Sequence, residues 1–205
     1  MAGFLSNFRN TMIVSVVLAL LMIVGYAMHS PHGTDEAFWQ AVFRWLHVFF
    51  GILWIGLLYY FNFVQIRVMP DVPAELKPAV SKYIAPEALF WFRWAALLTW
   101  VMGVILAISR HFLTEAATLG FAGGFTAPND YQYAFIGVGM WLATIMFVNV
   151  WAFIWPAQQI ALGMKEADAD AKAAAAKKAM MFSRINTLLS LPMLTAMAMN
   201  QTLFG

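Results

Sequence analysis

Residues 45–66, WLHVFFGILWIGLLYYFNFVQI, decide the fold because they form an apolar run that contains no Asp, Glu, Lys or Arg. About 20 such residues cross the hydrocarbon core of a bilayer as a helix. Four more stretches contain at most one charged residue each: residues 11–28, 88–109, 131–164 and 185–205. Charged residues make up 11% of the chain, against roughly 25% in soluble domains. This composition excludes a water-soluble globule and predicts an all-α, polytopic membrane helix bundle.

Five transmembrane helices are expected in one membrane domain covering residues 1–205, at about 11–29, 38–68, 86–111, 131–162 and 180–202. Nine of the 12 basic residues fall on one side of these crossings: Arg9, Arg67, Lys77, Lys82, Lys165, Lys172, Lys177, Lys178 and Arg184. By the positive-inside rule this side is cytoplasmic, which places the N-terminus inside and the C-terminus outside. Topology therefore explains the net charge of +2, and no nucleic-acid partner is expected.

Two connections on the predicted cytoplasmic side have a distinct composition. Residues 69–84 contain Pro70, Pro73 and Pro78 and are predicted to form a stiff loop. Residues 165–179 are rich in Ala and Lys, which favour helix, so one of the flanking helices is expected to continue beyond the membrane.

The chain has no cysteine, which excludes disulfides, thiolate metal sites, iron–sulfur clusters and covalently attached haem. Any redox centre must therefore use His, Met or other ligands. The 14 methionines are scattered through the helices, and core filling explains most of them. The apolar stretches contain no acidic residue, which argues against an ordinary proton-relay transporter.

His47 is the histidine that lies well inside an apolar segment, in the sequence RWLHV. Helical steps of three and four residues place Gly51, Trp54 and Leu58 on one face with it. A neutral imidazole there can ligate a haem iron or another metal, and Gly51 leaves room for a flat macrocycle. The alternative is a structural histidine that hydrogen-bonds a neighbouring helix.

A second axial ligand is harder to place. His111 ends the third predicted helix on the same side of the membrane and is the first candidate. His29 and His32 lie in the first loop, also on that side, so a copper or zinc site that uses several of the four histidines is a chemical alternative.

Arg93, in the sequence FWFRW, lies near the predicted cytoplasmic end of the third helix. Snorkelling toward lipid headgroups explains an arginine at this depth. The functional alternative is a counter-charge for a carboxylate such as a haem propionate, or a partner for a quinone headgroup, together with Arg184. Polar residues on nearby helices predict either a polar cluster or interhelical hydrogen bonds: Asn62, Gln65, Asn149, Gln158, Gln159, Asn186, Thr187 and Ser190.

Several short motifs together resemble one family. The second predicted helix contains RWLHV (residues 44–48), Gly51, WIG (54–56) and YYF (59–61), and the third contains FRW (92–94), TW (99–100) and Gly103. The fourth contains NVW (149–151) and PAQ (156–158), and the fifth contains SRINT (183–187) and SLP (190–192). In this order they resemble the membrane-embedded N-terminal domain of the membrane-bound urate oxidase (urate hydroxylase) family. The second helix is more distantly similar to small membrane protoporphyrinogen oxidases, which bind haem b, and to copper-resistance D proteins.

The resemblance implies a redox module of the bacterial inner membrane, with His47 at the family's histidine in the second helix. It concerns the membrane domain alone, because the sequence has no Cys-x-x-Cys-His motif. A truncated form without the cytochrome c domain is therefore expected. The sequence differs from the family pattern at Arg93, where Lys is expected, and at Ile185, where His is expected.

The leading hypothesis is an integral membrane protein that binds haem b and passes electrons, with a quinone or a periplasmic cytochrome as partner. His47 and His111 are the candidate iron ligands, Gly51 and Trp54 line the site, and Arg93 and Arg184 stabilise acidic groups. One alternative is a structural or assembly subunit of a larger membrane complex without its own cofactor. Copper handling through His47, His111, His29 and His32 is the third hypothesis, and the sequence leaves open whether the protein is an enzyme.

Overall fold

The computed structural model describes residues 2–124, 126 and 129–204, and in this part of the chain all regular structure is helical. The chain divides into two compact units, Met1–Val42 and Phe43–Gly205. The predicted all-α fold is therefore confirmed.

The first unit contains one long apolar helix. After a short helix α1 (Ala2–Leu5), α2 (Phe8–His29) begins at Asn7, whose side chain accepts hydrogen bonds from the backbone of the first turn. None of its residues is buried by the rest of the described chain. A helix that is apolar all round is stable only in an apolar surrounding, which fits a membrane span.

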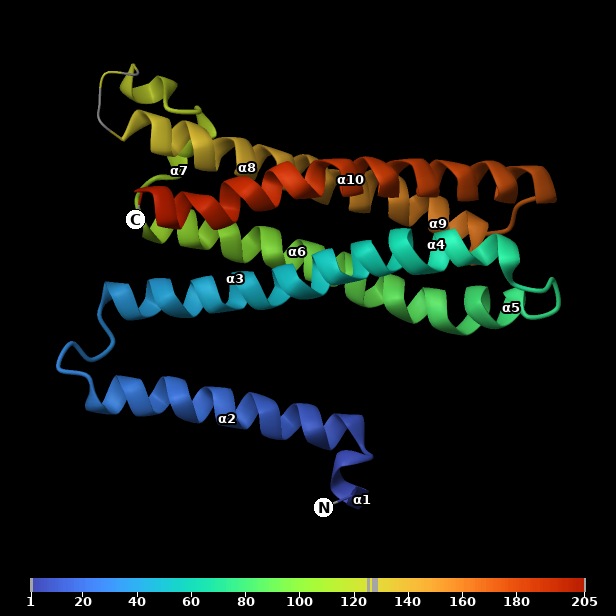
Figure 1. Ribbon diagram of the computed structural model, residues 1–205, viewed down its shortest axis with the longest axis horizontal. Coiled ribbons are helices and arrows are strands. Elements are labelled where there is room, and N and C mark those ends of the chain that lie inside the picture. Colours follow the sequence, from blue (N-terminus) through green and yellow to red (C-terminus); the bar gives the residue numbers. More distant parts are fainter. Residues whose placement is uncertain (1, 125, 127–128, 205) are drawn as a thin grey trace. The chain divides into compact units, whose positions relative to one another are not determined.

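The chain from Glu36 onward forms four long rods, which run antiparallel to one another (Figure 1). The first rod begins in the first unit, at Glu36, and continues into the second unit from Phe43. The first is α3 (Glu36–Tyr59), the wide turn η1 (Tyr60–Gln65), α4 (Ile66–Val68) and η2 (Met69–Asp71). The second is α5 (Lys77–Ala79), η3 (Val80–Ile84) and α6 (Ala85–Ser109), followed by the short elements α7 (Leu113–Ala117) and η4 (Phe121–Gly123). The third is α8 (Asp130–Val148), η5 (Asn149–Ile154) and α9 (Trp155–Ala161), and the fourth is α10 (Ala169–Phe204).

Four helical segments are long and apolar enough to cross a membrane: Phe8–His29, Glu36–Asp71, Lys77–Ser109 and Asp130–Ala161. The protein is thus an integral membrane helix bundle. α10 lacks this uniformly apolar composition because its inward face carries buried polar side chains, namely Ser183, Asn186, Ser190 and Asn200. Five crossings and the orientation of the chain therefore remain predictions.

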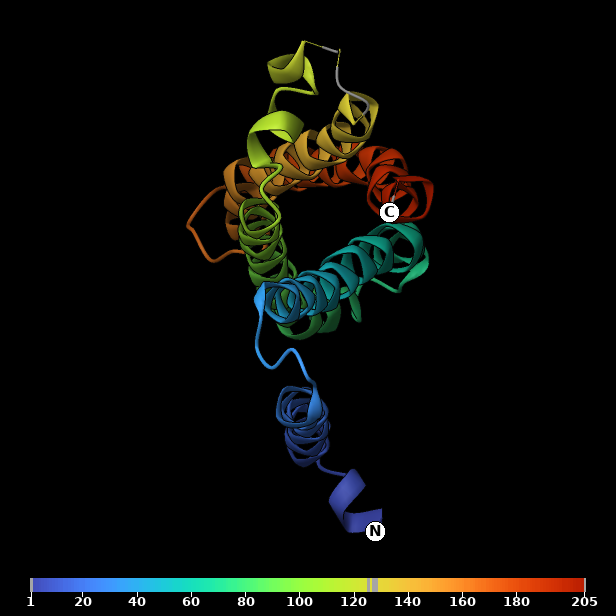
Figure 2. The same ribbon diagram turned by 90° about the vertical axis from the view of Figure 1, so that its left-hand side faces the viewer.

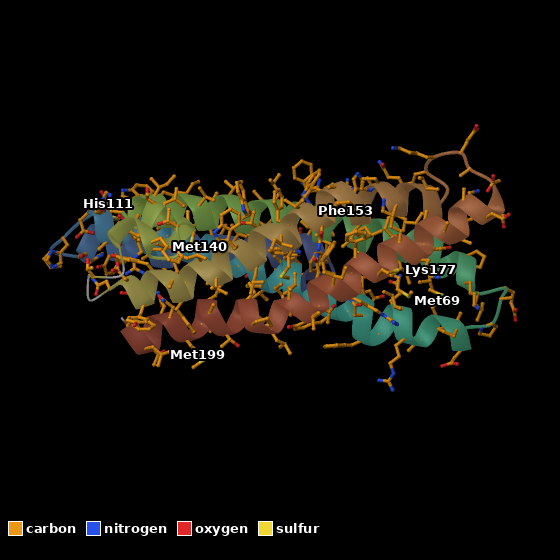
Figure 3. All side chains as sticks on the ribbon, turned by 90° about the horizontal axis from the view of Figure 1, so that it is seen from above. Met69, His111, Met140, Phe153, Lys177 and Met199 are labelled. Carbon is orange, nitrogen blue, oxygen red and sulfur yellow. The ribbon has the colours of Figure 1, made fainter. Side chains whose placement is uncertain are left out.

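The ends of the bundle differ in charge. Figure 3 shows Met69 and Lys177 toward one end and His111 at the other. Most of the basic residues that the sequence assigned to one side belong to the helical segments that flank residues 72–76 and 162–168. The positive-inside rule predicts that the Lys177 end faces the cytoplasm.

The predicted loop over residues 69–84 is shorter in the structure, which corrects the sequence analysis. Residues 69–71 and 77–84 are helical, so the connection is reduced to residues 72–76. Pro70 and Pro78 each stand in the first turn of a helical element, where the missing N–H leaves no hydrogen bond unmade. The helix expected over residues 165–179 is present from Ala169, as the start of α10.

The four rods surround a common axis when viewed from the end at which α3 begins (Figure 2). Their core contains Trp54, Leu58, Phe92, Met146 and Val150, each at most 2% exposed. The outer faces carry many exposed large apolar side chains, which are suited to contact with lipid tails.

α8 and α10 pack closely because small residues meet between them. A Cβ at Gly139 would lie 2.8 Å from Ala196 Cβ, well inside normal contact distance. Close approach through small residues is the usual way in which membrane helices associate. This contact fixes the C-terminal half of α10 against α8.

Three of the rods contain a wide π-helical turn: η1, η3 and η5. Two of these turns lie directly before a proline, Pro86 in α6 and Pro156 in α9. A proline ring crowds the carbonyl four residues before it and cannot donate a hydrogen bond to it. A wide turn at this point relieves the crowding without breaking the helix.

Candidate functional site

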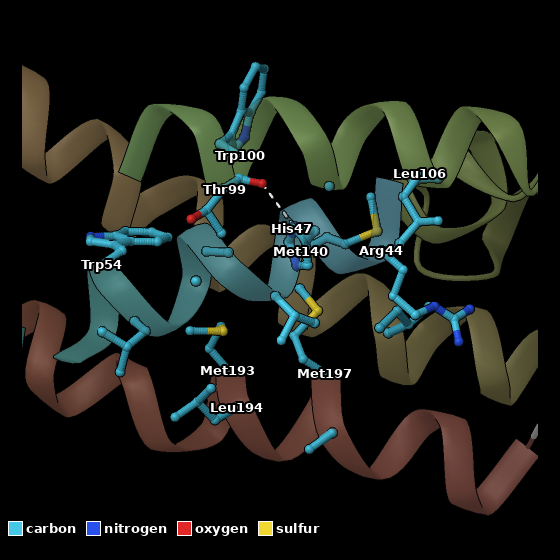
Figure 4. A pocket seen from close by; sticks show the side chains of 18 of the residues that line it. Arg44, His47, Trp54, Thr99, Trp100, Leu106, Met140, Met193, Leu194 and Met197 are labelled. Carbon is cyan, nitrogen blue, oxygen red and sulfur yellow. Dashed lines mark hydrogen bonds between the residues drawn. The ribbon is translucent and has the colours of Figure 1, made fainter. Parts of the chain in front are cut away.

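A partly open cavity of about 650 Å³ in the second unit is lined by residues of α3, α6, α8 and α10. Ligand pockets typically enclose about 300–1,000 Å³. Its walls are mostly apolar, and its polar groups are few and unevenly placed. Figure 4 shows Arg44 at one end of this cavity, His47 near the middle and Trp54 at the other end.

His47 is held by the backbone of the neighbouring helix. Its Nδ1 lies 2.9 Å from the carbonyl oxygen of Thr99, drawn as the dashed line in Figure 4. A carbonyl oxygen only accepts, so Nδ1 must carry the proton and donate it. In the neutral ring, Nε2 then retains its lone pair, and it makes no hydrogen bond with the described residues. The structure thus fixes both the tautomer and the orientation of a potential ligand.

Gly103 on α6 allows this arrangement. A Cβ at Gly103 would lie 2.9 Å from His47 Cε1 and 3.0 Å from His47 Nδ1. Any other residue would therefore push the imidazole away from its position. A Cβ at Gly51, by contrast, would meet only Thr99 Cγ2, at 3.7 Å, so Gly51 is not required for packing within the protein. It is among the residues that line the cavity.

Two arginines, Arg44 and Arg110, line the cavity at the same end. Arg110 also lies over the ring of Phe112, with 5.8 Å between its Cζ and the ring centroid. Neither arginine forms an ion pair with an acidic residue in the described part of the chain. Two cations beside an apolar cavity favour an amphipathic ligand with negative charge at one edge.

Trp54 and Tyr59 close the opposite end of the cavity. Trp54 is 1% exposed, and its buried Nε1 has no hydrogen-bond partner among the described residues. The hydroxyl of Tyr59 lies 3.0 Å from Ser190 Oγ. Trp54 thus lines the same cavity as His47, and the hydroxyl of Tyr59 links the cavity to α10.

His111 is exposed at the end of α6 and does not line the cavity. It has a φ of 56°, in the left-handed region. The next residue, Phe112, donates its backbone N–H to the carbonyl of Ala107, which closes the helix end. His111 therefore belongs to the turn that follows α6, and the structure does not bring it together with His47.

The two remaining histidines belong to the first unit. His29 Nδ1 lies 2.9 Å from the carbonyl of Gly25, and the backbone N–H of His32 donates to Ser30 Oγ. Within the described residues, no group of three or more metal-binding side chains of the His, Cys, Asp or Glu type comes together.

Arg93 and Arg184 also lie outside the cavity lining. The guanidinium of Arg93 stacks on Trp155, with 3.8 Å from Cζ to the ring centroid, and lies 5.4 Å from that of Phe90. Such cation–π contacts favour a guanidinium in apolar surroundings. Arg184 is exposed on α10.

The polar residues of the helices form hydrogen bonds between neighbouring rods. Asn62, in the wide turn η1, donates from Nδ2 to Ser183 Oγ at 2.8 Å and to the carbonyl of Leu58 at 2.9 Å. The amide of Asn62 thus joins η1 to α10, and it also gives the carbonyl of Leu58, near the end of α3, a hydrogen-bond donor.

The same pattern occurs at the wide turn η5. Asn149 Nδ2 donates to Asn186 Oδ1 at 2.9 Å, and Asn186 Nδ2 donates to the carbonyl of Met146 at 3.0 Å. Asn186 is completely buried. Of the two predictions for these polar residues, the described structure contains the interhelical hydrogen bonds.

Sequence reasoning missed several residues of the cavity: Thr99, Gly103, Met140, Met193 and Met197. Thr99 and Gly103 were part of the family motif, but nothing in the sequence indicated that they contact His47. The methionines have the spacing of ordinary core residues, so their position on the cavity wall had no signal in the sequence. Arg44 and Arg110 also line the cavity, and the sequence analysis assigned neither of them a role in the site.

Together, the fold and the cavity define an integral membrane helix bundle with one amphipathic cavity that contains a histidine. Residues 125–203, which cover α8, η5, α9 and nearly all of α10, match the sequence model of the urate oxidase N-terminal family. This match confirms the resemblance to the urate oxidase N-terminal domain. No curated protein and no solved structure matched the chain. His47 and the arginines of the cavity precede the matched segment.

Proposed function

We propose that the chain binds haem b in the cavity and passes single electrons within the membrane. The observation that carries this proposal is the geometry of His47, whose Nδ1 donates to Thr99 while Nε2 keeps its lone pair. Histidines that ligate metals almost always donate their other ring N–H to a carbonyl or a carboxylate. A neutral imidazole fixed in this way is a suitable axial ligand for iron.

The shape and charge of the cavity support the same ligand. Haem b is a flat apolar macrocycle with two propionates on one edge. The apolar walls suit the macrocycle, and Arg44 and Arg110 supply two cations at one end for the carboxylates. In this proposal they take the role that sequence analysis gave to Arg93 and Arg184.

Bound haem b supplies a one-electron iron couple. His47 would hold the iron, the apolar walls would contact the macrocycle, and Arg44 and Arg110 would pair with the carboxylates. Arg110 directly precedes His111, which lies at the end opposite Lys177 (Figure 3), so charge topology predicts that the arginine end faces outward. A quinone in the bilayer or a periplasmic cytochrome is therefore the proposed electron partner, and the bacterial inner membrane the proposed location.

The first test compares optical spectra of the oxidised and dithionite-reduced protein, purified in detergent after expression with added haem. We expect a Soret band and a reduced α band in the wild type. His47→Ala should lose them, and the matched control His111→Ala should keep them because His111 does not line the cavity. A wild-type protein without a Soret band would refute haem binding and favour a structural or assembly subunit.

The second test concerns the arginines. The wild type should bind haem more tightly than haem dimethyl ester, which lacks the two negative charges. A charge-assisted hydrogen bond contributes roughly 1.5–3 kcal/mol, so this preference should be on the order of tenfold or more per arginine. It should disappear in the double variant Arg44→Gln, Arg110→Gln and persist in Arg93→Gln. An unchanged preference in the double variant would show that the propionates lie elsewhere.

A further inference from the structure

The wall of the cavity across from the His47 helix is rich in methionine. Met140 lies on α8, and Met193 and Met197 lie on α10, one turn apart. No second histidine is among the residues that line the cavity. Tyr59 does line it, but its hydroxyl is hydrogen-bonded to Ser190. Thioether sulfur is therefore the available second ligand for an iron that His47 holds.

Met197 is better placed than Met193, its neighbour on α10. Figure 4 shows it on α10 at the level of His47, with Met193 one turn nearer to Trp54. Met193 is 5% exposed and belongs to the hydrophobic core. Met197 is only partly buried and packs against that core, so part of its side chain is open to a ligand.

The backbone beneath Met197 is held firmly. A Cβ at Gly139 would lie 2.8 Å from Ala196 Cβ and 3.5 Å from both Met193 O and Met197 Cε. This close contact fixes the turn of α10 from which Met197 projects. A ligand on a fixed helix keeps its position when the iron changes oxidation state.

We propose that Met197 is the second axial ligand, so that the iron is held by one histidine and one methionine from opposite walls of the cavity. This inference rests on the proposed haem binding. A methionine ligand raises the reduction potential of a haem above that of a pair of histidines, because the soft thioether stabilises the reduced iron. The protein would then accept electrons readily and pass them to a partner of still higher potential.

The test starts with wild-type protein reconstituted with haem. Magnetic circular dichroism in the far red detects the charge-transfer band between a thioether and ferric iron, and it requires no variant. We expect this band in the wild type. A haem-loaded protein without it would overturn the methionine assignment but leave the proposed haem binding intact, whereas a protein that takes up no haem refutes both.

Three near-isosteric variants then identify the residue: Met197→Leu, with Met193→Leu and Met140→Leu as matched controls. Met197→Leu should lose the thioether band, show a lower midpoint potential and bind carbon monoxide in the reduced state, because one axial position is open. Both controls should behave as the wild type. Loss of the band in a control but not in Met197→Leu would overturn the assignment to Met197.

Discussion

Gly103→Ala should displace His47 without unfolding the bundle. The added Cβ would lie 2.9 Å from His47 Cε1 and 3.0 Å from Nδ1, so the imidazole must shift by several tenths of an ångström. The 2.9 Å hydrogen bond to the carbonyl of Thr99 would be stretched by this shift. Overpacking of this kind typically costs about 1–3 kcal/mol. Converted at 1.4 kcal/mol per tenfold change, the affinity for haem should fall roughly 5- to 150-fold.

The assay is titration of the apo-protein with haem, followed by Soret absorbance, with helix content checked by circular dichroism. Gly25→Ala is the matched control, because a Cβ there meets nothing within 4 Å. It should leave the affinity unchanged. If Gly103→Ala binds haem as tightly as the wild type, the imidazole is not held as the geometry requires, and the argument from His47 fails.

Two further substitutions test the packing of the bundle, independently of any cofactor. Asn186→Ala removes a buried donor and acceptor and leaves Asn149 Nδ2 without its acceptor. The variant should be about 1 kcal/mol less stable in detergent than the wild type, as measured by thermal unfolding. A variant as stable as the wild type would mean that water replaces the lost hydrogen bonds. Gly139→Val should separate α8 from α10, because its Cβ would meet Ala196 Cβ at 2.8 Å, and should cost about 1–3 kcal/mol in the same assay. A variant as stable as the wild type would show that the two helices are not in close contact.

The fold was largely predictable, because charge-free stretches long enough to span a bilayer leave few alternatives to a helical bundle. His47 was also recognisable, since a histidine inside an apolar segment is costly without a role. The partners of His47 were not recognisable. Periodicity shows which residues share a face of one helix, but not which helix that face contacts.

The arginines illustrate this limit. Arg44 and Arg110 are far apart in the sequence, and each alone has the position of a snorkelling residue, yet both line one end of the cavity. Arg93 attracted the functional prediction because it lies deeper in its apolar segment. In the structure its charge is accommodated by Trp155, through a contact that depends on how α6 and α9 pack.

The wide turn η1 has an evolutionary consequence. Asn62 and its neighbours in Tyr60–Gln65 form a turn that contains one residue more than an α-helical turn would. Deleting one residue there would restore a regular α-helical turn and leave the segments on either side in nearly the same rotational register. His47 would keep its place on the cavity wall, but the turn that lets the amide of Asn62 reach both Leu58 and Ser183 would be lost. Among homologues, a gap of one residue in this stretch should therefore accompany the loss of the asparagine and leave the histidine in place.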